Sequence, residues 1–317
     1  MKEKVRAINV GGTQTLLNAC SSNGVLGLVY TSSANVVFSG KYEMPDPGED
    51  VPYNREEDCV DEYSKTKCLA EQLVVNYSGR ALKVRNSKLP QYDTISTCAV
   101  RPAAIYGEGE ERHFPRIIQM LEKGMLQFLV GSPGTLVDWV HVDNLVYGHV
   151  LAAAKLVSGH SEDRKLVSGK AYYISDKKPM NNFIFMRPLI EGLGFKFPSI
   201  WIPFKVMFKL AHLIEITHSI ISPIIPFEPF ANRAEVCKIG VTHYFRTDKA
   251  ERELGWSRVI SPEEGMNRMV TYFQDVQQKR KQQQKETKRK EGNSVFIAII
   301  LFGLLSAILW TYFDSVQ

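Results

Sequence analysis

The sequence predicts an α/β fold, with a parallel sheet covered by helices on both faces. Three observations support this prediction. Short apolar runs of strand length alternate with segments of helical periodicity, turn residues bound each run, and polar side chains follow the ends of the predicted strands. A β–α–β–α order of this kind is typical of parallel sheets, because each strand needs a crossover connection to the next.

The first half of the chain shows this order most clearly. The strand segments are short and rich in β-branched or aromatic residues, whereas the helical ones repeat apolar residues every three or four positions. The predicted elements are, in order, a helix at Gly12–Cys20, a strand at Leu26–Thr31, a helix within Cys59–Tyr77, a strand at Ser96–Arg101, a helix at Phe114–Glu122, an extended segment at Val137–Val140 and a helix at Val142–Leu156.

Beyond Lys170 the alternation is weaker. A strand is expected at Ala171–Ile174 and a helix at Asn181–Leu193. The stretch Pro203–Ile225 is strongly apolar but is interrupted by charged residues, so it is too polar for a membrane span and too apolar for a loop. It is interpreted either as a core helix or as the wall of an apolar substrate pocket that leans on a membrane.

The charge of the chain is concentrated in one short segment. The formal net charge is +5, and seven basic and two acidic residues between Lys279 and Glu291 account for all of it. The remaining sequence is neutral and offers no basic face, so no nucleic acid partner is expected. The five cysteines form no CxxC pair and no cluster at zinc spacing, which indicates a reducing compartment and no metal site.

The C-terminal region predicts a membrane anchor. Val295–Phe313 contains nineteen residues without a charge, and as a helix it would span roughly 28 Å, close to the thickness of the hydrocarbon core. The polar, basic segment 277–294 precedes it and would stay on the cytoplasmic side. Since the N-terminus lacks an apolar signal segment, the sequence predicts a single-pass, tail-anchored protein of the endoplasmic reticulum with a cytosolic catalytic domain.

Tyr63 and Lys67 are the strongest candidates for chemistry. Four residues apart on a helix, they project from one face with Cβ atoms about 6 Å apart. The ammonium is expected to favour the phenolate and to bring the tyrosine into the working range of a general base. Tyr173 and Lys177 have the same spacing, but they run from the end of a strand into a turn.

Other polar residues are expected at the same edge of the sheet. Ser32 and Ser33 follow the Leu26–Thr31 strand, and Arg101–Gly107 follows the Ser96–Arg101 strand. In open α/β sheets, ligands bind at the carboxyl ends of the strands. A serine there could hold a substrate carbonyl or alcohol beside Tyr63.

Several motifs together resemble the extended short-chain dehydrogenase/reductases, most closely the 42E-like members of the 3β-hydroxysteroid dehydrogenase branch. The motifs are NVGGT (Asn9–Thr13), LVYTSSANVVFSG (Leu28–Gly40), YSKTK (Tyr63–Lys67), VRPAAIYGEGE (Val100–Glu110) and DWVHVDN (Asp138–Asn144). The resemblance implies Tyr63 as the proton acceptor or donor, Lys67 as the residue that binds the ribose and lowers the pKa of Tyr63, and Ser33 as the residue that polarises the substrate, with Ser32 as the second choice.

The resemblance also implies a cofactor and partners. NAD or NADP would accept hydride from the 3β-hydroxyl of a steroid or sterol-like alcohol. The implied cofactor-binding residues are Asn9, Tyr63, Lys67, Pro102, Ala103 and Ala104. Asn9 is assigned either to a proton relay or to a helix start, and Asp138, His141 and Asp143 are interpreted as structural. The expected partners are the sterol-like molecule, the membrane and, in a homodimer, a second copy of the chain.

The implied organisation is a partial Rossmann domain at 1–170, a substrate-binding lobe at 171–276, a basic linker at 277–294 and the transmembrane helix at 295–313. The chain contains no GxxGxxG, and the resemblance implies that about 70–80 residues of the family's glycine-rich part lie outside it. Two alternatives therefore stay open beside the dehydrogenase. One is a non-catalytic membrane protein unable to bind the dinucleotide, and the other is a nucleotide-sugar epimerase or reductase.

Overall fold

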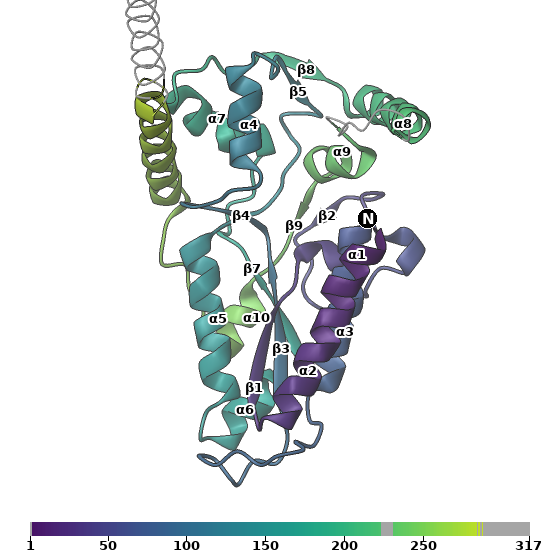
Figure 1. Ribbon diagram of the computed structural model, residues 1–317, viewed down its shortest axis with the longest axis vertical. Coiled ribbons are helices and arrows are strands. Elements are labelled where there is room, and N and C mark those ends of the chain that lie inside the picture. The colour runs from purple at the N-terminus through teal and green to yellow at the C-terminus, as the bar shows by residue number, and fades with distance from the viewer. Residues whose placement is uncertain (1, 223–230, 284, 286, 288–317) are drawn as a thin grey trace, which may run out of the picture. The chain divides into compact units, whose positions relative to one another are not determined.

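The computed structural model describes residues 2–222, 231–283, 285 and 287 (Figure 1). The chain divides into two compact units, Met1–Met269 and Val270–Gln317. The account below concerns the first unit, which contains every predicted site residue.

A parallel sheet of three strands lies at the centre of this unit. The strands are β1 (Gly27–Thr31), β3 (Ser96–Pro102) and β7 (Lys170–Ile174), in the order β1-β3-β7. Gly27 pairs with Ser96, and Cys98 pairs with Lys170. All three strands lie where the apolar runs predicted them, and their parallel pairing places their carboxyl ends at one edge.

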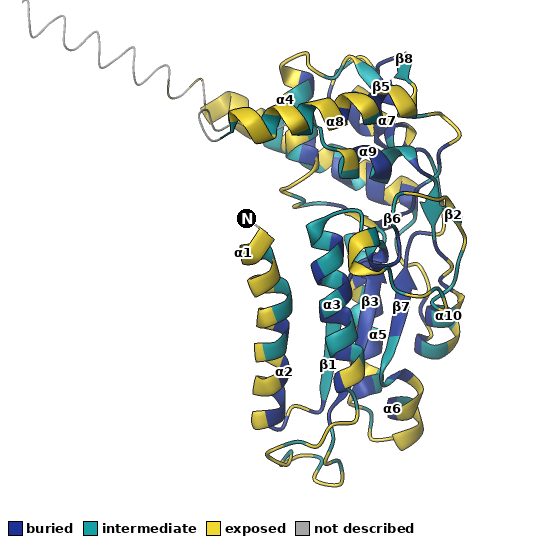
Figure 2. Ribbon diagram, turned by 90° about the vertical axis from the view of Figure 1, so that its right-hand side faces the viewer, coloured by how far each residue is buried: buried dark blue, intermediate teal, exposed yellow. Residues whose placement is uncertain are grey.

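Helices cover both faces of this sheet (Figures 1 and 2). One face carries a continuous helical segment, formed by α1 (Lys2–Arg6), the π-helical turn η1 (Ala7–Gly11) and α2 (Gly12–Ser22), and next to it α3 (Glu62–Tyr77). The other face carries α5 (Val142–Leu156), α6 (Ser161–Val167) and α10 (Asp248–Leu254). A parallel sheet with a helical layer on each face is the arrangement that the predicted α/β class describes.

The alternation of side chains along the strands builds two cores. On the α5 side, Cys98 and Val100 of β3 pack with Tyr172 and Ile174 of β7, and all four are fully buried. On the α3 side, Leu28 of β1 and its neighbours pack against buried residues of α2 and α3. Because successive residues of a strand point to opposite faces, one apolar run supplies both cores.

The remaining elements form a smaller lobe and the connections to it. Three short parallel strand pairs hold it together: β2 with β9, β4 with β6, and β5 with β8. The bounds are η2 (Ala34–Val36), β2 (Met44–Pro45), η3 (Glu56–Asp58), β4 (Ala104–Tyr106), α4 (Phe114–Glu122), β5 (Phe128–Val130), β6 (Trp139–His141), α7 (Asn182–Gly192), β8 (Ile200–Ile202), α8 (Phe204–Ile221), α9 (Arg233–Gly240) and β9 (His243–Tyr244).

Within the apolar stretch predicted at Pro203–Ile225, residues 204–221 form α8, and residues 223–225 lie outside the described residues; α8 does not behave as a core helix. Only Met207 and Ala211 of α8 are buried. Leu213 is 59% exposed and Ile220 is 67% exposed, as the largely exposed surface of α8 in Figure 2 shows. The apolar composition predicted burial, whereas the described part of the chain places few groups against this helix.

Two predictions are corrected here: the C-terminal transmembrane helix and the tail-anchored localisation. Among the described residues, no helix combines the length and the apolarity that crossing a bilayer requires. The predicted span at 295–313 lies outside the described residues. The length of the charge-free run and the basic segment that precedes it led to that prediction, and we do not retain it.

Candidate functional site

The candidate site lies where β1 ends beside the first turns of α3. Ser33 lies two residues after the end of β1, and Tyr63 and Lys67 occupy the first and second turns of α3. The structure therefore brings the three predicted catalytic residues to the carboxyl edge of the sheet, the place where open α/β sheets bind ligands.

Asp61 fixes the start of the helix that carries Tyr63. Its side chain caps α3, because Oδ1 accepts hydrogen bonds from the backbone N–H of Ser64 at 2.8 Å and from its hydroxyl at 2.6 Å. Its Oδ2 accepts from Lys238 of α9 at 2.6 Å. Burial raises the pKa of Asp61, but Lys238 and Ser64 outweigh burial and hold it below its usual value.

Removing this cap is expected to weaken the fold in a pH-dependent way. Asp61→Ala should lower the free energy of unfolding by about 1–2 kcal/mol at neutral pH, as lost helix caps do. Because the pKa of Asp61 is depressed in the folded state, its stabilisation is present above the pKa of the unfolded chain and disappears as pH falls through the folded value. Urea unfolding at neutral and acidic pH checks this difference.

Asp61→Asn is the matched control for that experiment. The amide oxygen still caps α3, so most of the stability at neutral pH should remain. The pH dependence contributed by residue 61 should disappear, because the amide does not titrate. A loss equal to that of Asp61→Ala would contradict the capping role.

Tyr63 lies in a partly buried environment with a serine and cations around it. Burial raises the pKa of its phenol, and the charge of Arg112 and a hydrogen bond with Ser33 act in the opposite direction. The ammonium of Lys238 lies 5.8 Å from the centre of the Tyr63 ring. The net shift is upward, whereas the spacing with Lys67 predicted a lowered pKa. Desolvation, which spacing alone does not report, decides the direction.

Lys67 points toward the end of β1. Its Nζ donates to the carbonyl oxygen of Thr31 at 2.7 Å and to the hydroxyl of Tyr30 at 3.3 Å. Burial lowers the pKa of this ammonium, and the charge of Glu71 raises it. An ammonium carries three N–H donors, and within the described ranges no third acceptor contacts it. One donor is therefore free for a ligand hydroxyl.

The two serines of the strand end differ in their partners. Ser33 is 8% exposed and accepts from the backbone N–H of Asn35 at 3.2 Å, and its side chain acts to lower the pKa of the Tyr63 phenol. The hydroxyl of Ser32 is buried and has no hydrogen-bond partner among the described residues. The structure thus joins Ser33, the first choice of the sequence, to the tyrosine.

The other predicted cofactor residues surround this edge. Pro102 ends β3 and is buried, Ala103 donates its N–H to the carbonyl of Ile174 at 3.1 Å, and Ala104 is exposed. Asn9 lies in the π-helical turn η1, and its side chain donates to the hydroxyl of Thr66 on α3 at 2.9 Å. Asn9 is therefore hydrogen-bonded to α3, the helix that carries Tyr63, and it does not stand at the start of a helix.

Sequence reasoning missed a buried ion pair next to the site. Glu71 of α3 and Arg101 of β3 have side chains 0% and 3% exposed, and Arg101 Nη2 lies 2.7 Å from Glu71 Oε1. Glu71 is four residues after Lys67, the one sequence signal that could have suggested it. Spacing does not show that both groups are buried or that they meet.

Asp138, His141 and Asn144 of the DWVHVDN motif are buried away from the candidate site, whereas the Asp143 side chain is 45% exposed. The carboxylate of Asp176 accepts from the hydroxyl of Tyr106 at 2.7 Å, from the side chain of Asn144 at 2.7 Å and from the backbone N–H of His141 at 3.1 Å. Asp138 accepts from the N–H of Phe245 at 2.9 Å, and burial raises the pKa of its carboxyl to about 7. Both carboxylates hold strands and loops together.

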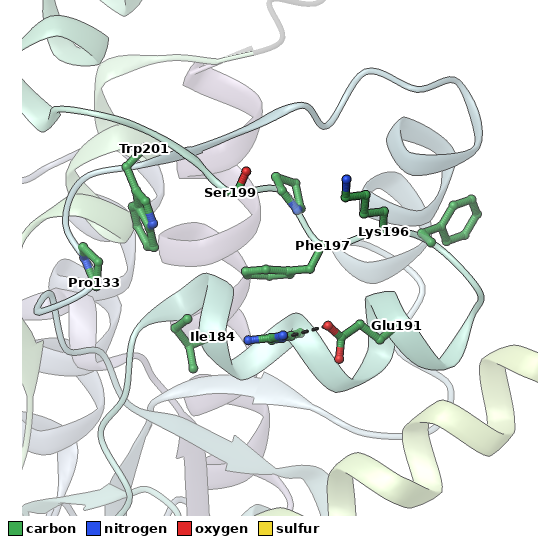
Figure 3. Close-up of a pocket in the computed structure, with 10 residues that line it drawn as sticks. Pro133, Ile184, Glu191, Lys196, Phe197, Ser199 and Trp201 are labelled. Atoms are coloured by element: carbon green, nitrogen blue, oxygen red, sulfur yellow. Dashed lines mark hydrogen bonds and ion pairs between the residues drawn. The ribbon is translucent and has the colours of Figure 1, made fainter.

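A hollow of about 640 Å³ lies in the smaller lobe (Figure 3). Its lining includes Trp201 and Phe197, and Arg187 donates to Glu191 at 2.8 Å along one side of it. None of Tyr63, Lys67 and Ser33 lines it. It is therefore distinct from the edge that carries the candidate catalytic residues.

Comparison with known proteins gives a consistent set of relatives. Residues 1–206 match the model of the 3-beta hydroxysteroid dehydrogenase/isomerase family. Short-chain dehydrogenase/reductase family 42E member 1 of Bos taurus is 47% identical over 254 residues, which cover 80% of this chain and 62% of the relative. The 3beta-hydroxysteroid-dehydrogenase/decarboxylase isoform 2 of Arabidopsis thaliana is 32% identical over 267 residues, 84% of this chain and 45% of that protein.

A solved structure gives the same fold. UDP-glucuronic acid 4-epimerase from Bacillus cereus, crystallised with UDP-glucuronic acid and NAD, is 16% identical, has a TM-score of 0.56 and is matched over 85% of this chain and 68% of its own. At this identity the likeness concerns the fold alone. The chain spans less than two thirds of the length of the 42E relative.

Proposed function

The chain belongs to the 3-beta hydroxysteroid dehydrogenase/isomerase family, and from this premise we propose that it is an NAD(P)-dependent oxidoreductase that acts on the 3β-hydroxyl of a sterol-like alcohol. Membership confirms the family predicted from the sequence motifs. The observation that carries the proposed reaction is the position of three residues at the end of β1. Tyr63 and Lys67 lie one helical turn apart on α3, Lys67 donates to the Thr31 carbonyl at 2.7 Å, and Ser33 lies two residues beyond Thr31.

The residues at the edge fit one half of a dinucleotide. The free N–H of Lys67 suits a ribose hydroxyl, and the loop after Pro102 lies at the end of the neighbouring strand. Lys67, Tyr63, Pro102, Ala103 and Ala104 would hold the nicotinamide ribose part, beside Asn9 on η1. When bound, the nicotinamide supplies the hydride acceptor. The sequence of this chain contributes no glycine-rich turn for the pyrophosphate.

Three residues of the chain would orient the substrate, transfer the proton and bind the ribose. The hydroxyl of Ser33 orients the substrate oxygen toward Tyr63. The phenolate of Tyr63 removes the proton of the alcohol during oxidation, and the phenol returns it during reduction. The Lys67 ammonium, held by the carbonyl of Thr31, binds the ribose and adds positive charge beside the developing phenolate.

The substrate class rests on the relatives. The Arabidopsis relative is named a 3beta-hydroxysteroid dehydrogenase, and the Bacillus neighbour is an epimerase with a nucleotide sugar. Sequence identity is much higher to the steroid branch, which favours a sterol-like alcohol. Product analysis with NAD and a panel of 3β-hydroxysteroids, against a parallel panel of UDP-sugars, tests the choice. Turnover of the sugars alone would replace it by the epimerase or reductase alternative.

Dinucleotide binding by this chain separates an enzyme from a binding protein. NADH fluorescence enhancement on the 317-residue chain should saturate at micromolar concentrations if the edge residues suffice. Lys67→Met should weaken the binding, because it removes the ribose-facing ammonium. Absence of NADH binding by the folded chain would favour the non-catalytic alternative.

The rate of alcohol oxidation is expected to rise with pH. Burial raises the pKa of Tyr63, so its neutral form dominates at neutral pH and the phenolate base becomes populated only on the alkaline side. The rate of the reverse reduction, which needs the phenol, should fall over the same range. Measuring kcat/KM between about pH 6 and about pH 10 checks both directions. A plateau of the oxidation rate already at neutral pH would contradict the raised pKa.

A further inference from the structure

The carboxylate of Glu71 is buried one helical turn beyond Lys67. The residue is 0% exposed. Its Oε1 accepts three hydrogen bonds, from Arg101 Nε at 2.9 Å, from Arg101 Nη2 at 2.7 Å and from the hydroxyl of Tyr53 at 2.7 Å. Three donors converging on one oxygen fix the position of this side chain and of the helix segment that carries it.

Arg101 extends this fixation to the sheet. It is 2% exposed and immediately precedes Pro102, where the candidate cofactor loop begins. Its Nη1 donates to the hydroxyl of Tyr173 on β7 at 3.0 Å, and its guanidinium lies 5.2 Å from the Tyr53 ring and 5.0 Å from the Tyr173 ring. One ion pair thus ties α3 to β3 and β7 at the edge that carries the candidate site.

A purely structural tie would not need charges here. A buried ion pair is costly to desolvate, and apolar residues of similar volume often stabilise a core as well or better. The second oxygen of Glu71 is also buried and has no hydrogen-bond partner among the described residues. One oxygen of the carboxylate is therefore left without a partner within the described part of the chain.

Lys67 is the cation that gains from this charge. Glu71 and Lys67 are four residues apart on α3, so their side chains lie on one face of the helix. Burial disfavours the charged form of the Lys67 ammonium, and the Glu71 carboxylate opposes that effect. The ammonium also depends on α3 keeping its register with β1, whose Thr31 carbonyl it contacts.

We propose that Glu71, fixed by Arg101, is the positioning residue of Lys67, because it holds α3 in register with the strand end and the Pro102 loop. This inference rests on the proposed function, because it gives Lys67 its role at the cofactor. The other titratable groups that surround the pair and Lys67 are Tyr30 on β1, Glu49 and Tyr53 between η2 and α3, Tyr63 and Cys68 on α3, Tyr173 on β7 and Lys249 on α10.

The test is the titration of Lys67 itself in the full chain. In protein labelled with ¹³C at the lysine Cε, NMR follows the Lys67 signal, which Lys67→Met identifies. Glu71→Gln is expected to lower the pH at which Lys67 titrates and to reduce kcat/KM by about 10- to 100-fold, the scale of a misplaced catalytic group. Glu57→Gln removes an exposed carboxylate that precedes α3 and should leave both quantities unchanged.

A second variant separates positioning from folding, because Glu71→Gln leaves Arg101 buried without its anion. The double variant Glu71→Gln with Arg101→Met removes both charges, so its thermal stability should recover toward that of the original chain. The Lys67 titration should stay displaced and kcat/KM should stay low.

Two results would overturn the inference. In the first, Lys67 titrates in both variants as it does in the unchanged chain. In the second, the double variant regains turnover together with stability, which would make the pair a structural tie only. If the unchanged chain oxidises no alcohol but Glu71→Gln still displaces the Lys67 titration, the proposed function fails while the link between Glu71 and Lys67 stands.

Discussion

Replacing Tyr63 by phenylalanine is expected to reduce kcat for alcohol oxidation by about 10²- to 10⁴-fold, the contribution of a positioned general base. Only the hydroxyl is lost, and this hydroxyl is the group whose pKa the Ser33 side chain acts to lower. The affinity for NADH should stay nearly unchanged, because the ring and the Lys67 ammonium remain. Steady-state kinetics with the substrate found by product analysis, together with NADH fluorescence titration, measures both quantities.

Tyr42→Phe is the control, since Tyr42 is 75% exposed and has the same chemistry outside the site. It should alter neither kcat nor NADH affinity. A Tyr63→Phe variant that keeps more than about a tenth of the original kcat would remove Tyr63 from the proton-transfer role. Loss of NADH affinity with unchanged kcat would instead assign Tyr63 to binding.

The positions of the helices and strands could largely be predicted, because local periodicity determines them. The predicted bounds of α4 and α5 coincide with the observed ones, and β1, β3 and β7 differ from their predictions by one residue at one end. Tyr63 and Lys67 share a helix face for the same reason, since a spacing of four is a local property. The strand end predicted a serine at this edge, and the resemblance implied Ser33 as the first choice over Ser32.

Properties that depend on packing could not be predicted. Glu71 and Arg101 are 30 residues apart, and no pattern in either segment shows that they meet. The direction of the Tyr63 pKa shift depends on how deeply the phenol is buried, which spacing does not report. Similarly, the apolar residues of α8 were interpreted as a core helix or as the wall of an apolar pocket, and most of them are exposed. Composition reports what a segment could bury, not whether a neighbour covers it.

The same distinction applies to the acidic residues in and around the DWVHVDN motif, which the sequence analysis interprets as structural. Asp176 was not singled out, yet it accepts hydrogen bonds from Tyr106 of β4, His141 of β6 and Asn144 of α5. It follows β7, so one carboxylate joins the central sheet to the strand pair that leads into the smaller lobe. We therefore expect Asp176, and not Asp143, to dominate the stability of this region.

Asp176→Ala should lower the free energy of unfolding by about 3 kcal/mol or more. Each of the three donors would lose its acceptor, and a buried donor left without a partner costs about 1–3 kcal/mol. Asp143→Ala is the matched control, because the Asp143 side chain is 45% exposed and pairs with Arg268 at 3.0 Å. Exposed pairs of this kind contribute about 0–1 kcal/mol. Urea denaturation measures the free energy of unfolding of both variants. Equal decreases would contradict the dominant role of Asp176, because burial of its three donors would then not determine the loss of stability.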